Sequence, residues 1–171
     1  MDQQSLQTLQ QLSSEVKTRL ESSQPVVVFG IGSELLGDDR AGVAVARTVQ
    51  EKNLPFLKGV AGCSAPENVT GEVTAYKPAL VVLVDAADMR IAPGNIRLVS
   101  PEDISGVSFS THSLPLPLII SYLKSSLAAE FLVAGIQPQS TSFSLQLSPA
   151  VDHAVKCLLA SLLPQNGDGS Y

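Results

Sequence analysis

Four acidic residues and one histidine stand where side chains of these types can bind a metal ion or move a proton. Asp38 and Asp39 lie in the stretch VVVFGIGSELLGDDRAG, and Asp85 and Asp88 follow the apolar run VVLV. His112 lies in FSTHSLPLPL. Carboxylates and an imidazole together form an oxygen and nitrogen ligand set, which suits a divalent transition-metal ion with open coordination positions.

Each of these residues also has a simpler structural interpretation. Asp38 or Asp39 could cap the helix that follows, because free amides and the helix dipole stabilise an acid there. Asp85 could form a turn at the end of a strand, and His112 could be a solvated loop residue or a helix cap. Because the residues are far apart in the sequence, their spacing leaves both interpretations open.

The loop before the acid pair has the glycine spacing of a phosphate-binding loop without its other residues. Gly32 and Gly37 match G-x-x-x-x-G, but Asp38 and Asp39 occupy the positions of the Lys and the Ser or Thr that contact phosphate and magnesium. A dinucleotide fingerprint would need a glycine where this chain has Leu35. Two acids would also repel a pyrophosphate, so a nucleotide-binding domain is disfavoured.

The elements that must position these residues alternate between strands and helices. Apolar runs predict strands over residues 26–31, 56–63, 79–84, 95–100 and 130–136. Helical spacing and end signals predict helices over residues 5–20, 39–52, 113–127 and 149–163. This alternation predicts an α/β fold, a three-layer sandwich with a mainly parallel twisted sheet and helices on both faces. Ligands of such sheets bind beyond the carboxyl ends of the strands, which is where Asp38, Asp39, Asp85, Asp88 and His112 are expected.

The chain divides into an N-terminal helical extension (1–23), one domain (24–165) and a flexible tail (166–171). In the extension an apolar stripe is expected to pack against the domain, and its members are Leu6, Leu9, Leu12, Val16 and Leu20. The segment SAPEN, residues 64–68, is expected to open a short helical turn, because Ser64 and Glu67 have capping-box spacing.

Composition excludes several classes of protein. A hydrophobic content of 44% with 16% charged residues is typical of a globular protein and not of a disordered one. A net charge of −5 without a Lys/Arg cluster argues against nucleic acid or anionic membrane as the main partner. The polar N-terminus and the absence of a long apolar run favour a cytoplasmic protein. Two cysteines give neither a disulfide framework nor a zinc site. We expect a monomer or weak dimer.

Six segments, taken in order, resemble the NiFe-hydrogenase maturation endopeptidases. They are FGIGSELLGDDRAG, GCSAPEN, VVLVDAADM, PGNIRLVSPEDI, STHSLPL and FLVAGIQP, within residues 25–163. The most similar subgroup processes the large subunit of hydrogenase 3, the formate hydrogenlyase hydrogenase. The resemblance implies cleavage of one peptide bond near the C-terminus of the large-subunit precursor, after nickel insertion. It therefore implies a nickel-loaded precursor as partner and nickel carried by that precursor as the metal.

The resemblance also implies roles for particular residues. Asp39, Asp85 and His112 match the metal site of the family, with Asp38 left as a loop and cap residue. Two positions depart from the family pattern. Ser33 stands where an Asn is common, and Arg40 replaces the usual Gly after the acid pair, which places a cation next to the site.

A second group of residues is expected to bind the substrate. Its members are Gly37, Asp38, Arg40, Ser64, Glu67 and Asn68. Asp39 or Asp85 would take part in catalysis, either where metal polarises the carbonyl or activates a water or as a general base on water. The alternative function on the same fold is a nickel-binding maturation chaperone that cuts nothing.

Overall fold

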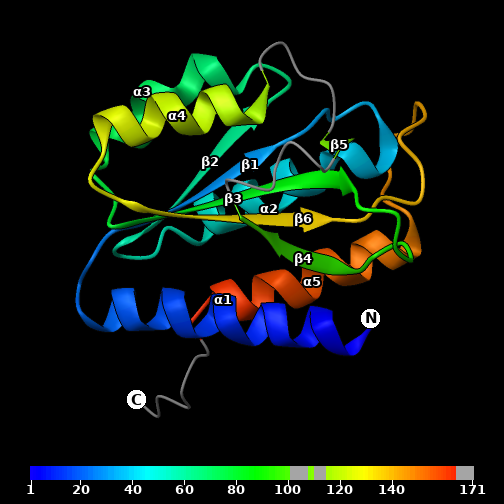
Figure 1. Ribbon diagram of the computed structural model, residues 1–171, viewed down its shortest axis with the longest axis horizontal. Coiled ribbons are helices and arrows are strands. Elements are labelled where there is room, and N and C mark those ends of the chain that lie inside the picture. Colours follow the sequence, from blue (N-terminus) through cyan, green and yellow to red (C-terminus); the bar gives the residue numbers. More distant parts are fainter. Residues whose placement is uncertain (101–107, 110–114, 165–171) are drawn as a thin grey trace.

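The computed structural model describes residues 1–100, 108–109 and 115–164, and its centre is a twisted sheet (Figure 1). The strands are β1 (Val26–Ile31), β2 (Leu57–Cys63), β3 (Leu80–Asp88), β4 (Ile96–Val99), β5 (Ser108–Phe109) and β6 (Glu130–Ile136). Their order is β2-β1-β3-β6-β4, with β5 paired to the end of β3. The pairs β1–β2, β1–β3 and β3–β6 are parallel, and β4 runs antiparallel along β6 at the edge. The predicted mainly parallel sheet is therefore confirmed.

Helices cover both faces of the sheet, which confirms the three-layer sandwich (Figure 1). The helices are α1 (Gln3–Glu21), η1 (Gly37–Arg40), α2 (Ala41–Lys52), η2 (Pro66–Val69), α3 (Thr70–Ala75), α4 (Leu116–Ser126) and α5 (Pro149–Leu162), where η denotes a 3₁₀ helix. Helices α1, α2 and α5 share one apolar core with the sheet, and α3 and α4 share the other. Among the described residues, no helix combines the length and the apolar character needed to cross a membrane.

Strand β3 continues beyond the predicted end at Val84. Its last residues pair with the short antiparallel strand β5, with Ala87 opposite Phe109 and Asp88 opposite Ser108. Asp85 therefore lies inside the strand, where it pairs with Gly135 of β6. The interpretation of Asp85 as a turn former at a strand end is wrong, because pairing with a segment distant in sequence extends the strand.

The N-terminal helix α1 packs against its own domain, as the apolar stripe predicts. Leu9, Leu12 and Val16 are buried in the core shared with α5, whereas Leu6 is 52% exposed. The start of the helix is tied to the edge strand, because the Ser5 hydroxyl accepts the N–H of Ile96 at 2.9 Å. The predicted stripe is thus correct in its centre and too long at its N-terminal end.

Asp2 fixes the first turn of α1 to the same strand. Its carboxylate accepts the N–H of Ser5 at 2.9 Å and pairs with Arg97 at 2.5 Å. The hydrogen bonds from Arg97 and Ser5 hold the pKa of the Asp2 carboxyl well below its usual range. The carboxylate therefore stays charged and continues to cap the helix in mildly acidic solution.

Candidate functional site

The carboxyl ends of β1 and β3 form the crevice where the candidate site lies. From β1 the chain proceeds to β2 on one side, whereas β3 lies on the other side of β1, so the strand order reverses between β1 and β3. Ligands of open α/β sheets bind at such a switch point. The segment η1 and the start of α2 lie directly over it, since η1 contacts β3 and α2 contacts both strands.

Glycine at position 42 allows this close approach. A Cβ atom on Gly42 would lie 2.1 Å from the carbonyl oxygen of Val84 and 2.4 Å from that of Ile31. Both distances are far inside van der Waals contact, and both atoms belong to the backbone. The absence of a side chain at Gly42 therefore sets the height of the acid pair above the ends of the two strands.

We expect Gly42→Ala to lower the free energy of unfolding by about 2–3 kcal/mol, as overpacking against rigid backbone does. It should also impair activity, because η1 must lift away from β3. Urea denaturation measures the first effect. Gly71→Ala in α3 is the matched control, because its Cβ would meet nothing within 4 Å and alanine favours the helix. Equal stability of the two variants would contradict the proposed packing role of Gly42.

Asp39 is buried with one carboxylate oxygen engaged. It is 2% exposed, and its Oδ2 accepts the N–H of Ser33 at 2.7 Å. Its Oδ1 is buried and finds no hydrogen-bond partner among the described residues. Burying a polar atom without a partner is costly, so this oxygen fits a cation or a substrate proton. Neither η1 nor α2 has a side-chain cap, so the helix-cap interpretation of Asp39 is wrong.

Asp38, by contrast, is saturated within the protein. Its carboxylate accepts the N–H groups of Gln139, Ser140 and Ser148 at 2.8, 3.0 and 2.7 Å and the Ser148 hydroxyl at 2.9 Å. The side chain is 1% exposed. Asp38 does not cap the helix that follows it. It fastens the loop between β6 and α5 instead, and this geometry gives it no free oxygen for a substrate.

Asp85 lies at the same edge of the sheet as Asp39. It is 1% exposed, and alternation along β3 places its side chain on the face of Val81 and Leu83, which is covered by α3 and α4. Contact between η1 and β3 brings the two acidic segments together. His112, the third predicted ligand, lies outside the described residues. Within residues 1–100, 108–109 and 115–164, no three His, Cys, Asp or Glu side chains form a group suited to a metal ion.

Gly37 and Arg40 hold the same loop that Asp38 fastens. Gly37 has a φ of +53°, and a Cβ there would lie 2.8 Å from the carbonyl oxygen of Ser140. The guanidinium of Arg40 donates to the carbonyl oxygen of Leu145. The positive charge predicted next to the site is thus directed at a backbone carbonyl. A substrate group that binds Arg40 would have to displace this carbonyl oxygen.

The SAPEN segment follows β2 at the same edge. Ser64 and Asn68 are exposed and Glu67 is half-buried. The N-cap residue of η2 is Ala65, and no side chain caps this helix. The predicted capping box of Ser64 and Glu67 is therefore not formed. The exposed positions remain available to a substrate, and their binding role stays a prediction.

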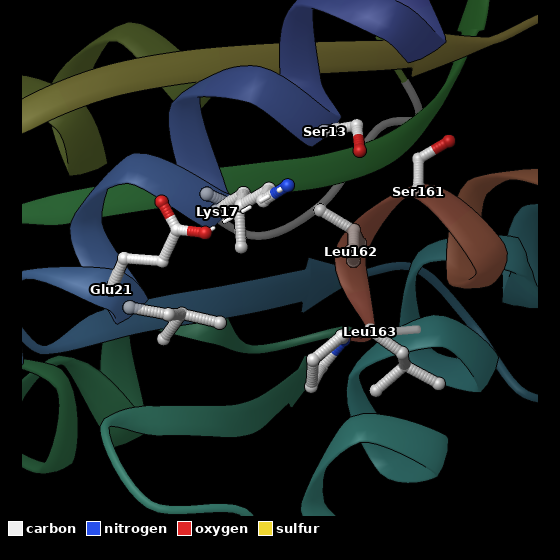
Figure 2. A pocket seen from close by; sticks show the side chains of 9 residues that line it. Ser13, Lys17, Glu21, Ser161, Leu162 and Leu163 are labelled. Carbon is white, nitrogen blue, oxygen red and sulfur yellow. Dashed lines mark ion pairs between the residues drawn. The ribbon is translucent and has the colours of Figure 1, made fainter. Parts of the chain in front are cut away.

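A hollow of about 250 Å³ lies elsewhere, between the C-terminal halves of α1 and α5 (Figure 2). Lys17 and Glu21 form an ion pair of 3.7 Å at its wall. None of the predicted site residues lines it; the lining residues are Ser13, Val16, Lys17, Leu20, Glu21, Ser161, Leu162, Leu163 and Pro164. It therefore contributes nothing to the arrangement at the carboxyl edge.

The sequence analysis missed the part played by residues 137–148. They connect β6 to α5 and pack beside the acid pair through their hydrogen bonds to Asp38. Gln137 is 7% exposed and accepts the N–H of Met89 at 2.7 Å while donating to Asp88 at 3.2 Å. The hydrogen bonds from Arg90 and Gln137 lower the pKa of the Asp88 carboxyl. In the sequence, the one local signal of this role was a glutamine directly after an apolar strand.

Comparisons with known proteins give one consistent family. The HycI family, described as hydrogenase maturation protease, matches residues 43–165. The hydrogenase 3 maturation protease of Escherichia coli is 33% identical over 150 residues, which cover 85% of this chain and 93% of that protein. The crystal structure of a NiFe hydrogenase maturation protease HycI from Thermococcus kodakarensis has a TM-score of 0.71 at 30% identity, covering 81% of this chain and 92% of that one. The solution structure of the endopeptidase HycI from Escherichia coli has a TM-score of 0.70 at 30% identity, covering 80% and 87%.

Proposed function

The chain belongs to the hydrogenase maturation protease family and is a peptidase, and on this premise we propose that it removes the C-terminal peptide of a NiFe-hydrogenase large-subunit precursor after nickel insertion. The metal is part of the substrate in this proposal. The precursor presents nickel held by its own ligands, and Asp39, Asp85 and His112 add oxygen and nitrogen ligands to it. Cleavage is thereby conditional on metal loading.

The observation that carries this proposal is the state of the Asp39 carboxylate. Its Oδ2 is fixed by the Ser33 N–H at 2.7 Å, and its Oδ1 is buried without a hydrogen-bond partner among the described residues. One bond thus orients the group and leaves the other oxygen for a ligand. A carboxylate oxygen is a ligand that divalent cations accept, and the charge of a bound cation would offset the cost of burial.

The residues of the chain would supply acid–base chemistry at the scissile bond. In hydrolysis a carboxylate takes a proton from the attacking water, the water oxygen bonds to the carbonyl carbon, and the proton passes to the departing amine. In this proposal Asp39 or Asp85 is the carboxylate that takes the proton. Nickel on the precursor would polarise the carbonyl of the scissile bond.

Incubation with a large-subunit precursor, with and without nickel, tests the proposal. We expect the nickel-loaded precursor to lose its C-terminal peptide, seen as a mass decrease, and the nickel-free precursor to remain intact. Precursor that binds but keeps its mass in both conditions would instead support the nickel-binding maturation chaperone. Equal cleavage without nickel would contradict recognition of the metal.

A further inference from the structure

Two neighbouring loops at the site expose large apolar side chains. Leu35 and Leu36 are 54% and 40% exposed, and Phe143 and Leu145 are 77% and 60% exposed. We call these four residues the apolar rim. Phe143 is the most exposed large apolar side chain among the described residues, and packing within the chain gives no reason for this exposure.

The backbone holds the two halves of the apolar rim together. Leu36 and Ser144 form a parallel bridge, with the Ser144 N–H donating to the carbonyl oxygen of Leu35 at 3.0 Å and the Gly37 N–H donating to that of Ser144 at 2.9 Å. The Asp38 carboxylate then binds the same loop through four hydrogen bonds. The rim is therefore a fixed surface, so docking on it costs little ordering entropy.

The apolar rim is continuous with the candidate catalytic acid. Only Gly37 and Asp38 stand between Leu36 and Asp39, and the N–H of Asp39 donates to the carbonyl oxygen of Leu36 at 3.0 Å. A polypeptide with its scissile bond at Asp39 would therefore lie across these side chains. Enzymes position a reacting bond through contacts of this kind with neighbouring parts of the substrate.

Apart from Asp39, the charged groups of the two loops are already engaged. Glu34 pairs with Arg47 at 2.8 Å, Arg40 donates to the carbonyl oxygen of Leu145, and Asp38 is buried and saturated. A charged partner segment would find no complementary side chain there and would lose its hydration. An apolar segment would gain free energy from burial against the four side chains.

From these contacts we infer that the apolar rim is the docking surface for an apolar segment of the precursor next to the cleaved bond. The inference rests on the proposed function and adds to it the chemistry of the recognised segment. The rim residues act in docking, and the carboxylates act on the bond. The rim thus contributes affinity for the polypeptide, while the acids ligate the nickel of the precursor and act on the bond.

The double variant Leu35→Ser/Phe143→Ser tests this inference with nickel-loaded precursor as the probe. We expect KM to rise about tenfold or more with kcat nearly unchanged, because burial of the Leu35 and Phe143 side chains in the complex would supply part of the binding free energy. Leu6→Ser in α1 is the matched control, since Leu6 is 52% exposed and should change neither parameter. An unchanged melting temperature of the double variant would show that its fold is intact.

Direct binding separates failure of this inference from failure of the proposed function. In an Asp39→Asn background, which keeps the precursor uncut, the double variant should bind the precursor about tenfold more weakly. Wild-type protein that binds precursor without cutting it would refute the proposed function, while the binding comparison would still decide the role of the rim. Equal binding of the precursor by both proteins would overturn the docking role. A wild-type dimer that becomes a monomer in the double variant, with processing unchanged, would overturn it as well.

Discussion

Asp39→Asn is expected to reduce processing of the nickel-loaded precursor by about a thousandfold, the scale on which a positioned acid–base group contributes. The substitution keeps the size of the side chain, and the amide oxygen can still accept the Ser33 N–H that now binds Oδ2 at 2.7 Å. What disappears is the negative charge on the buried oxygen that lacks a partner among the described residues. A neutral amide is a weaker ligand for a divalent cation and cannot take a proton from water.

The stability of the same variant distinguishes a catalytic acid from a structural one. Because the Oδ1 atom of Asp39 is buried without a hydrogen bond in the described structure, removing its charge should leave the free energy of unfolding unchanged or raise it by up to about 1 kcal/mol. Asp152→Asn on α5 is the charge-matched control, because its carboxylate pairs with Lys156 at 2.6 Å on the surface. Rapid processing by Asp39→Asn, or its unfolding at lower urea concentration, would contradict the assignment.

Asp38→Ala is expected to have the opposite profile, with a loss of about 2–4 kcal/mol in the free energy of unfolding. The carboxylate is 1% exposed and accepts three backbone N–H groups and one hydroxyl. Without it, these four donors lose their acceptor together, and each one that the fold shields from water pays a desolvation cost. The loop of residues 139–148 should detach from η1, so processing should fall as a consequence of lost structure.

Urea denaturation followed by circular dichroism measures this loss. Asp88→Ala is the matched control, since Asp88 also accepts two hydrogen bonds from loop groups, at 3.1 and 3.2 Å, but is solvent-exposed. We expect its effect to stay below about 1 kcal/mol, because water replaces the lost acceptor. If Asp38→Ala were no less stable than Asp88→Ala, the fastening role of Asp38 would be refuted.

Asp38 and Asp39 show how much of the site can be predicted from the sequence. It places both at the carboxyl edge of the sheet, because both follow β1, whose apolar run is unambiguous. Spacing alone does not separate their roles, since both precede a helix and both suit its N-terminus; the family resemblance assigns Asp39 to the metal and leaves Asp38 as a loop and cap residue. The partners of Asp38 lie 101 to 110 residues further along the chain, and no local pattern reveals them.

The sequence by itself determined the layered α/β architecture, since strands β1 and β6 have the bounds that their apolar runs predict and the buried stripes of the helices follow helical spacing. Its motifs also carry the family resemblance, which the comparisons confirm. His112 as a ligand stays a prediction. Only the tertiary structure decided that β3 runs past Asp85, that Asp38 binds the loop before α5 instead of capping a helix, and that an apolar rim adjoins Asp39. The reason is physical: burial patterns repeat along the chain and are local, whereas hydrogen bonds and surface clusters join segments that only folding brings together.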